Sequence, residues 1–147
     1  MKRNSRTQRG QLLAAALLVS VLIATSQAAG ITSFTGEFTL TNQVLWGASV
    51  LQPGNYTVCI VSHAGSTLAL VRDGKGRAVG IFANRFDSGK TTARNALLIK
   101  EKGGQPHVYC LELASLGRVL VYDPVLAREA VLEARAPQTV PVMLAKR

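Results

Sequence analysis

The stretch TSFTGEFTLT, residues 32–41, alternates polar positions with phenylalanine, glycine or leucine from Ser33 onward. Phe34, Gly36, Phe38 and Leu40 fall on one face of an extended chain, and serine, threonine and glutamate side chains fall on the other. Because successive side chains of a β-strand point to opposite faces of the sheet, this period of two predicts a strand with one face in a core and one in water.

The same alternation recurs along the chain and is interrupted by turn residues. Pro53-Gly54 predicts a chain reversal, since proline presets its own φ and glycine tolerates a positive φ. Glycine-rich turns at 73–77 and 102–106 predict two hairpins. The strands expected besides 32–41 cover residues 56–61, 67–72, 78–83, 96–101, 107–113 and 117–122.

Seven or so short strands at intervals of about ten residues indicate an all-β fold, a single antiparallel sandwich or barrel-like domain. Asp123 before Pro124 is typical of a helix start and predicts one short C-terminal helix over 125–134. Pro137 ends that helix, and residues 137–147 are expected to form an edge strand or an extended tail. The polar stretch 84–95 predicts a long exposed loop with Phe86 tucked inward.

The first 28 residues have the three parts of an export signal. Four basic residues lie within residues 1–9, the apolar run 12–24 predicts a short signal helix, and Ser26 and Ala28 suit cleavage after Ala28. An uncleaved membrane anchor is the alternative, but the apolar run is shorter than the roughly 20 residues that span a bilayer. We therefore expect a signal peptide over 1–28, a single β domain over 29–147, and a periplasmic or secreted protein.

Removing the signal changes the charge of the chain. The full sequence carries +9, but four of its 17 basic residues lie in the signal, which leaves 13 basic against 8 acidic residues, or +5. The remaining basic residues are scattered and are not interleaved with aromatic residues, so nucleic-acid binding is not expected. An envelope polysaccharide or another envelope protein is the expected kind of partner, with membrane contact only through an uncleaved signal.

Cys59 and Cys110 each lie within an apolar, strand-like run. In an oxidising compartment the pair is a candidate disulfide. The alternative is two buried free thiols on separate strands, because cysteine packs well as a small apolar group.

No motif for catalysis, a cofactor or a metal stands out. Ser88-Gly89-Lys90-Thr91 resembles the end of a phosphate-binding loop, but Asn84 occupies the position of its first glycine. His63 and His107 are the only histidines and have no metal-ligand spacing. A secreted hydrolase, which would need one of them beside acidic residues, is an alternative to the prediction of no enzyme activity.

Trp46 and Tyr56 are candidate ligand-binding residues, together with Arg85 and Lys90 in the expected exposed loop. The two aromatic rings could form a flat platform for a sugar ring. They could equally pack in the core near the Pro53-Gly54 turn.

Trp46-Gly47 followed by LQPGNYTV, residues 51–58, resembles the W-G...L-x-P-G-x-Y-x-V segment of small exported β-domain proteins of Acidobacteria-type soil bacteria. Transthyretin-like and carboxypeptidase-regulatory-like sandwiches share part of this pattern, although they often place the proline where this chain has Gln52. Neither resemblance implies a catalytic residue.

The sequence thus predicts an exported, non-catalytic β-sandwich module with a structural or binding role in the periplasm or cell envelope. Alternatives are a secreted hydrolase, a carbohydrate-binding module using Trp46 and Tyr56, and an assembly subunit using the edge 139–144.

Overall fold

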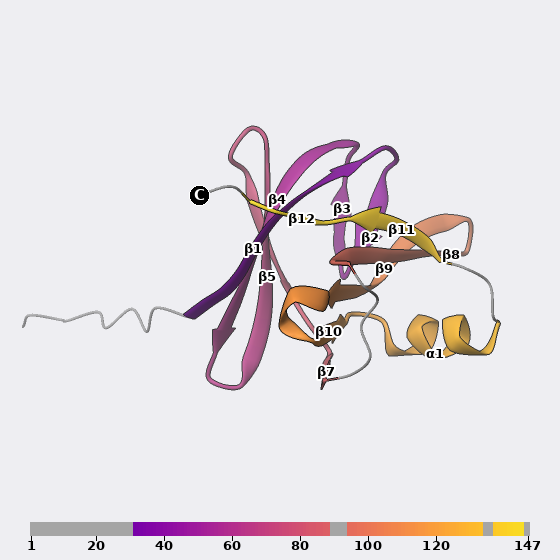
Figure 1. Cartoon of the computed structure of the whole chain (residues 1–147). Coiled ribbons are helices and arrows are strands. Elements are labelled where there is room, and N and C mark those ends of the chain that lie inside the picture. Colours follow the sequence, from indigo (N-terminus) through magenta and orange to yellow (C-terminus); the bar gives the residue numbers. More distant parts are fainter. Residues whose placement is uncertain (1–30, 89–93, 134–136, 146–147) are drawn as a thin grey trace, which may run out of the picture.

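A computed structural model describes residues 31–88, 94–133 and 137–145. These residues form two β-sheets that pack face to face, with one α-helix on the outside of the second sheet (Figure 1). The prediction of an all-β sandwich with one short C-terminal helix is confirmed. The predicted signal peptide and Lys90 lie outside the described residues. No helix within the described ranges is long and apolar enough to cross a membrane.

The first sheet has the order β12-β1-β4-β5-β6. Its strands are β1 (Ile31–Leu40), β4 (Gly54–His63), β5 (Ser66–Asp73), β6 (Ala78–Phe82) and β12 (Met143–Leu144). The alternation predicted for β1 is present, because Phe34, Phe38 and Leu40 are buried whereas Glu37 and Thr39 are exposed. The predicted hairpin around residues 73–77 is the β5–β6 pair.

The second sheet has the central order β11-β8-β9-β10-β7. Its strands are β11 (Gln138–Pro141), β8 (Ala96–Lys102), β9 (Gln105–Leu113), β10 (Arg118–Val121) and β7 (Arg85–Ser88), and the short 3-10 helix η1 (Ala114–Leu116) precedes β10. A small hairpin of β2 (Val44–Trp46) and β3 (Ser49–Leu51) joins the first half of β9. Among the described residues only the β2–β9 pairing is parallel, so the fold is antiparallel apart from this short contact. The described residues form twelve strands instead of about seven, since several are only two to four residues long.

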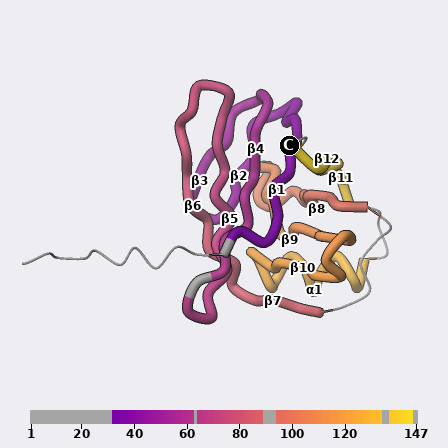
Figure 2. The backbone as a smooth tube through the Cα atoms, turned by 60° about the vertical axis from the view of Figure 1, so that its left-hand side comes forward, coloured from indigo at the N-terminus to yellow at the C-terminus, as the bar shows by residue number. Residues whose placement is uncertain are grey.

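The chain crosses from one sheet to the other on both sides of the sandwich (Figure 2). On one side β6 leads into β7. The N–H of Ala83 donates to the Thr67 carbonyl at 3.1 Å in the first sheet, and the N–H of Asn84 donates to the Val121 carbonyl at 2.9 Å in the second. These two hydrogen bonds fix the crossing point within two consecutive residues.

On the other side β11 leads into β12, where the sequence predicted an edge strand or an extended tail. The N–H of Val142 donates to the Asn95 carbonyl at 2.9 Å, and the N–H of Ala145 donates to the Thr35 carbonyl at 3.2 Å. Between the two strands the side chain of Val142 enters the core, where it is 4% exposed. The C-terminal segment is therefore part of both sheets.

Trp46 and Tyr56 belong to the core between the sheets. Trp46 is 0% exposed and packs edge-on against Phe38 and Tyr122, with ring centroids 6.0 and 5.2 Å away. Tyr56 is 9% exposed, stacks on Phe38 at 5.5 Å, and donates its hydroxyl to the Gln52 carbonyl at 2.7 Å. A sugar platform needs an exposed aromatic face. Neither ring offers one, so their placement agrees with the core interpretation.

The expected long loop over 84–95 is partly wrong. Residues 85–88 form β7, which pairs with β10 from Arg118↔Ser88 to Val121↔Arg85. Phe86 is 42% exposed and does not tuck inward, and the guanidinium of Arg118 lies over its ring at 4.9 Å. A cation over an aromatic face is a favourable contact that keeps the ring at the surface.

The predicted disulfide is wrong, because Cys59 and Cys110 are both free. Cys59 lies on β4 between the core residues Val58 and Ile60, so its side chain points away from the core of the sandwich. Cys110 lies on β9 in the other sheet and packs in a separate cluster with Leu126 of the helix. The alternative of two free thiols on separate strands is the observed one.

Candidate functional site

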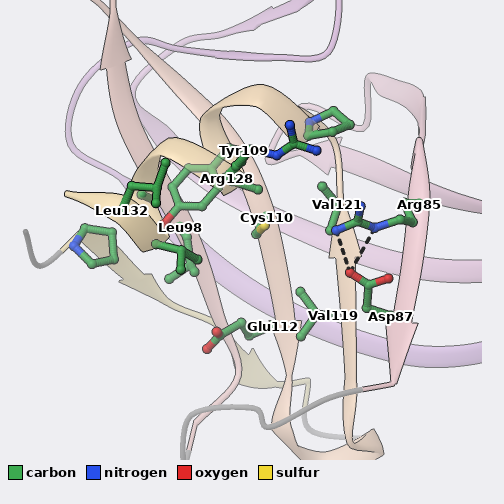
Figure 3. A pocket seen from close by; sticks show the side chains of 15 residues that line it. Arg85, Asp87, Leu98, Tyr109, Cys110, Glu112, Val119, Val121, Arg128 and Leu132 are labelled. Atoms are coloured by element: carbon green, nitrogen blue, oxygen red, sulfur yellow. Dashed lines mark hydrogen bonds and ion pairs between the residues drawn. The ribbon is translucent and has the colours of Figure 1, made fainter. Parts of the chain in front are cut away.

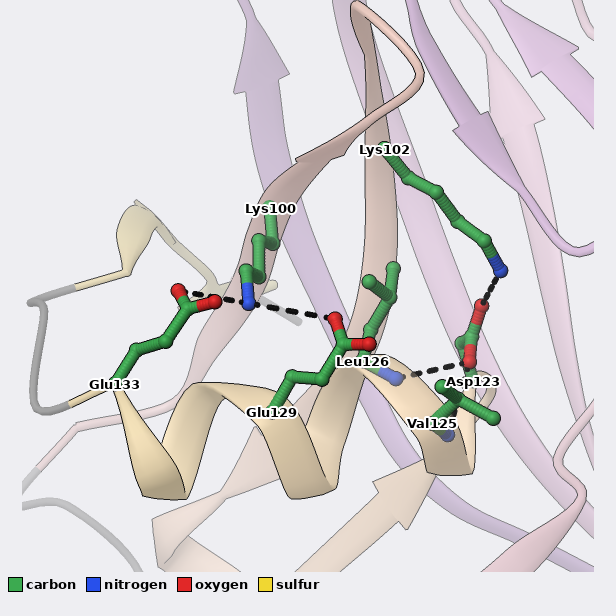
Figure 4. Close-up of polar contacts among 7 residues, drawn as sticks. All are labelled: Lys100, Lys102, Asp123, Val125, Leu126, Glu129 and Glu133. Carbon is green, nitrogen blue, oxygen red and sulfur yellow. Dashed lines mark hydrogen bonds and ion pairs between the residues drawn. The ribbon is translucent and has the colours of Figure 1, made fainter.

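The helix α1 (Pro124–Leu132) begins where the sequence predicted. The Asp123 carboxylate accepts hydrogen bonds from the N–H groups of Val125 and Leu126 at 3.0 and 3.1 Å, as an N-cap residue does (Figure 4). Its other oxygen lies 3.1 Å from the Lys102 ammonium. Partial burial alone would raise the pKa of the Asp123 carboxyl, but the Leu126 N–H, Lys102 and the Val125 N–H outweigh it and lower that pKa.

Few contacts hold α1 on the second sheet. Leu126 is its only buried residue within the described chain. Farther along the helix, the Lys100 ammonium on β8 lies 2.9 Å from Glu133 and 3.5 Å from Glu129 (Figure 4). The helix is therefore fixed at its start by Asp123 and near its end by Lys100.

A β-bulge shapes the sheet beneath the helix. Leu98 pairs with Cys110 while the next residue, Ile99, pairs with Val108, so Tyr109 is the extra residue on β9. The Tyr109 carbonyl accepts the N–H of Tyr122 at 2.8 Å, which ties the bulge to the segment just before α1. Tyr109 and Cys110 consequently both pack in the cluster under the helix.

A groove runs between α1 and the outer face of the second sheet. It encloses about 500 Å³. Leu98, Cys110, Val119 and Val121 form its floor, and α1 and β7 flank it (Figure 3). The helix also leaves Val131 and Leu132 at its rim, where they are 82% and 77% exposed. The groove therefore joins an apolar floor to an exposed apolar rim.

Among the described residues, four charged side chains border this groove. Arg85 and Asp87 on β7 pair with each other, with the nearest guanidinium nitrogen 2.9 Å from the carboxylate. Arg128 projects from the helix, and Glu112 lies on β9 with 9% exposure. In the view of Figure 3, Arg128 lies above the floor and Glu112 below it. The groove thus has opposite charges at opposite ends.

Two titratable groups beneath the helix, Cys110 and Tyr109, are neutral at physiological pH. Burial, reinforced by the negative charge of Glu112, raises the pKa of the Cys110 thiol to about 12. Burial also raises the pKa of Tyr109 to about 12. A thiol must ionise to act as a nucleophile, so this environment opposes nucleophilic chemistry at Cys110.

The predicted site residues lie in different parts of the molecule. Arg85 borders the groove, whereas Trp46 and Tyr56 belong to the core between the sheets. His63 ends β4 in the first sheet and His107 lies on β9 in the second. Within the described residues, no group of three or more His, Cys, Asp or Glu side chains could hold a metal ion.

Most residues of the groove were not predicted from the sequence. Val119 and Val121 are apolar at positions that face away from the sandwich core, because Leu120 between them points inward. A strand that is apolar on both faces is a signal of a second covered surface, and that signal was available.

Comparison of the chain with known protein families, curated proteins and solved structures finds no match.

Proposed function

We propose that this chain is an exported, non-catalytic β-sandwich module that holds an aliphatic ligand in the groove between α1 and the second sheet, in the periplasm or outside the cell. The observation that carries the proposal is the hollow of about 500 Å³ with a floor of aliphatic side chains and a neutral thiol. Small-molecule sites are hollows of this size, mostly apolar, with a few polar groups that fix orientation.

The expected affinity follows from the apolar area that such a ligand would bury. Burying eight methylenes at ~0.8 kcal/mol each gives roughly 6 kcal/mol. Before the cost of immobilising the ligand, this corresponds to a dissociation constant of about 0.04 mM. That cost weakens binding, so we expect dissociation constants of about 0.1 mM or above. The exposed Val131 and Leu132 at the rim could add contacts to a longer chain.

The export part of the proposal rests on the sequence. Residues 1–28 have the charge, the apolar run and the small residues of a signal peptide, and the segment 46–58 resembles that of exported β-domain proteins. N-terminal sequencing of the protein recovered from the outside of the producing cell should give Ala29 as the first residue. Recovery of the intact chain from the cytoplasm would contradict export.

A hydrolase is less well supported. The Cys110 thiol stays protonated below about pH 12, and His107 is not among the residues that border the groove. Nucleophilic catalysis needs an ionisable nucleophile beside a base. The groove offers aliphatic contact instead, which suits binding.

The neutral probe N-phenyl-1-naphthylamine tests the groove, because its fluorescence rises in apolar surroundings. We expect saturable binding that Val119→Phe weakens at least fivefold, since the larger ring fills the floor. Val61→Phe is the matched control, because Val61 is equally half-buried but lies on the first sheet away from the groove. Absence of saturable binding, or equal loss in both variants, would refute the proposal.

A further inference from the structure

We propose that the ligand of the groove is a straight-chain carboxylate whose anionic head binds the guanidinium of Arg128. This inference rests on the proposed function and adds the chemistry of the head group. It follows from the pairing of the charged residues around the groove and from the neighbours of Arg128 on α1.

Of the two arginines among the described residues that border the groove, Arg128 is the one without an ion pair. The guanidinium of Arg85 is bound to Asp87 at 2.9 Å on the opposite wall. Two carboxylates of the helix segment, Glu129 and Glu133, reach Lys100 on β8. Among the described residues Arg128 makes no ion pair, so its charge is available to a ligand.

The helix neighbours of Arg128 carry no carboxylate. Residues three and four positions away lie beside it on the helix surface, and these are Val125, Val131, Leu132 and Pro124. Three of them also border the groove. Arg128 is itself exposed, and its helix neighbours offer no carboxylate that would compete with a ligand for its guanidinium.

The shape of the groove favours one charged end and one aliphatic chain. A guanidinium matches a carboxylate with two parallel hydrogen bonds. No second arginine of the groove is free at the other end, because Arg85 is bound to Asp87 among the described residues. Between the two ends lie Val119, Val121 and Leu98, which offer only apolar contact. A monocarboxylate with an unbranched chain fits this arrangement.

Three dodecyl compounds with different heads test the inference by displacing N-phenyl-1-naphthylamine, all below their micelle concentrations. Dodecanoate should displace the probe at a concentration about two- to fivefold lower than dodecanol, the gain expected for an ion pair at an exposed site. Dodecyltrimethylammonium should bind more weakly than dodecanol. Octanoate, which has two methylenes fewer than the eight that the groove buries, should bind about 15-fold more weakly than decanoate, since each buried methylene contributes about fourfold.

Arg128→Gln should abolish the preference of dodecanoate over dodecanol and leave dodecanol binding unchanged. Arg72→Gln is the matched control, because Arg72 is an exposed arginine on β5 of the other sheet. Both sites are exposed, and Trp46 fluorescence verifies that each variant is folded.

The outcomes separate the two proposals. Equal displacement by dodecanoate and dodecanol, or a preference that survives Arg128→Gln, overturns the carboxylate inference and leaves the apolar groove standing. Failure of the neutral probe and of every dodecyl compound to bind overturns the proposed function as well.

Discussion

Adding one methyl group at Gly36 should disrupt the crossing of the C-terminal segment between the sheets. An ideal Cβ on Gly36 would lie 2.7 Å from a terminal methyl carbon of Val142 and 2.7 and 2.9 Å from two ring carbons of Phe34. Both side chains are buried and cannot swing into solvent. Overpacking of this kind costs about 1–3 kcal/mol, so we expect Gly36→Ala to lower the free energy of unfolding by about 2 kcal/mol.

A double-mutant cycle separates the clash with Val142 from the clash with Phe34. Val142→Ala alone should cost about 2 kcal/mol, because it leaves a cavity in the core. In the double variant the new methyl at position 36 fills part of that cavity, and one of the short contacts is gone. The double variant should therefore be about 1 kcal/mol more stable than the sum of the two single changes predicts.

Urea unfolding followed by the fluorescence of Trp46, the only tryptophan, measures these free energies. Gly80→Ala on β6 is the matched control, since a Cβ there meets at 3.1 Å only the end of Leu68, which is half-exposed and can move. It should change stability by less than about 0.5 kcal/mol. Two results would refute the packing of Val142 against Gly36 where the chain crosses between the sheets. One is a free energy of unfolding that Gly36→Ala leaves unchanged, and the other is losses at positions 36 and 142 that simply add in the double variant.

Three further predictions concern α1 and the thiols. Asp123→Ala should cost about 1 kcal/mol through loss of the N-cap. The folded-state pKa of Asp123 is lowered, so its carboxylate should stabilise the fold fully above about pH 4 and progressively less as the pH falls further. Urea unfolding at a series of pH values measures this loss. The Cys110 thiol ionises near pH 9.0 in the unfolded chain but at about pH 12 in the folded protein. Between pH 9 and 11 the free energy of unfolding should therefore fall by up to about 1.4 kcal/mol per pH unit from Cys110 alone. Cys110→Ala should flatten this slope, and an unchanged slope would contradict the burial of the thiol. Mass spectrometry after iodoacetamide treatment at pH 8 should show Cys59 modified well before Cys110, whereas equal rates would count against the burial of Cys110.

The local signals in the sequence predicted the local parts of the fold. Strict alternation identified β1, and paired glycines identified the β5–β6 and β8–β9 hairpins. Asp123-Pro124 identified the start of α1, because a cap acts on the residues directly after it. Each of these features depends on side chains only a few positions apart.

The pairing of strands far apart in the sequence could not be predicted from these local signals. The parallel pairing of Leu45 with His107 and the crossing at Val142 depend on segments more than 40 residues apart. The disulfide prediction failed for this reason, since nothing local indicates that Cys59 and Cys110 point to the outsides of different sheets. Of the candidate ligand-binding residues that the structure describes, only Arg85 borders the groove, because the groove exists only once α1 folds onto the sheet.

The central claim is that the groove under α1 binds an aliphatic ligand, and methyl NMR tests it most directly. Titration of the protein with dodecanoate should shift the methyl signals of Val119, Val121 and Leu132, which border the groove. The methyl signals of Val61 and Leu70, on the first sheet, should stay in place. Shifts confined to Val61 and Leu70, or no shifts at saturating dodecanoate, would contradict the claim.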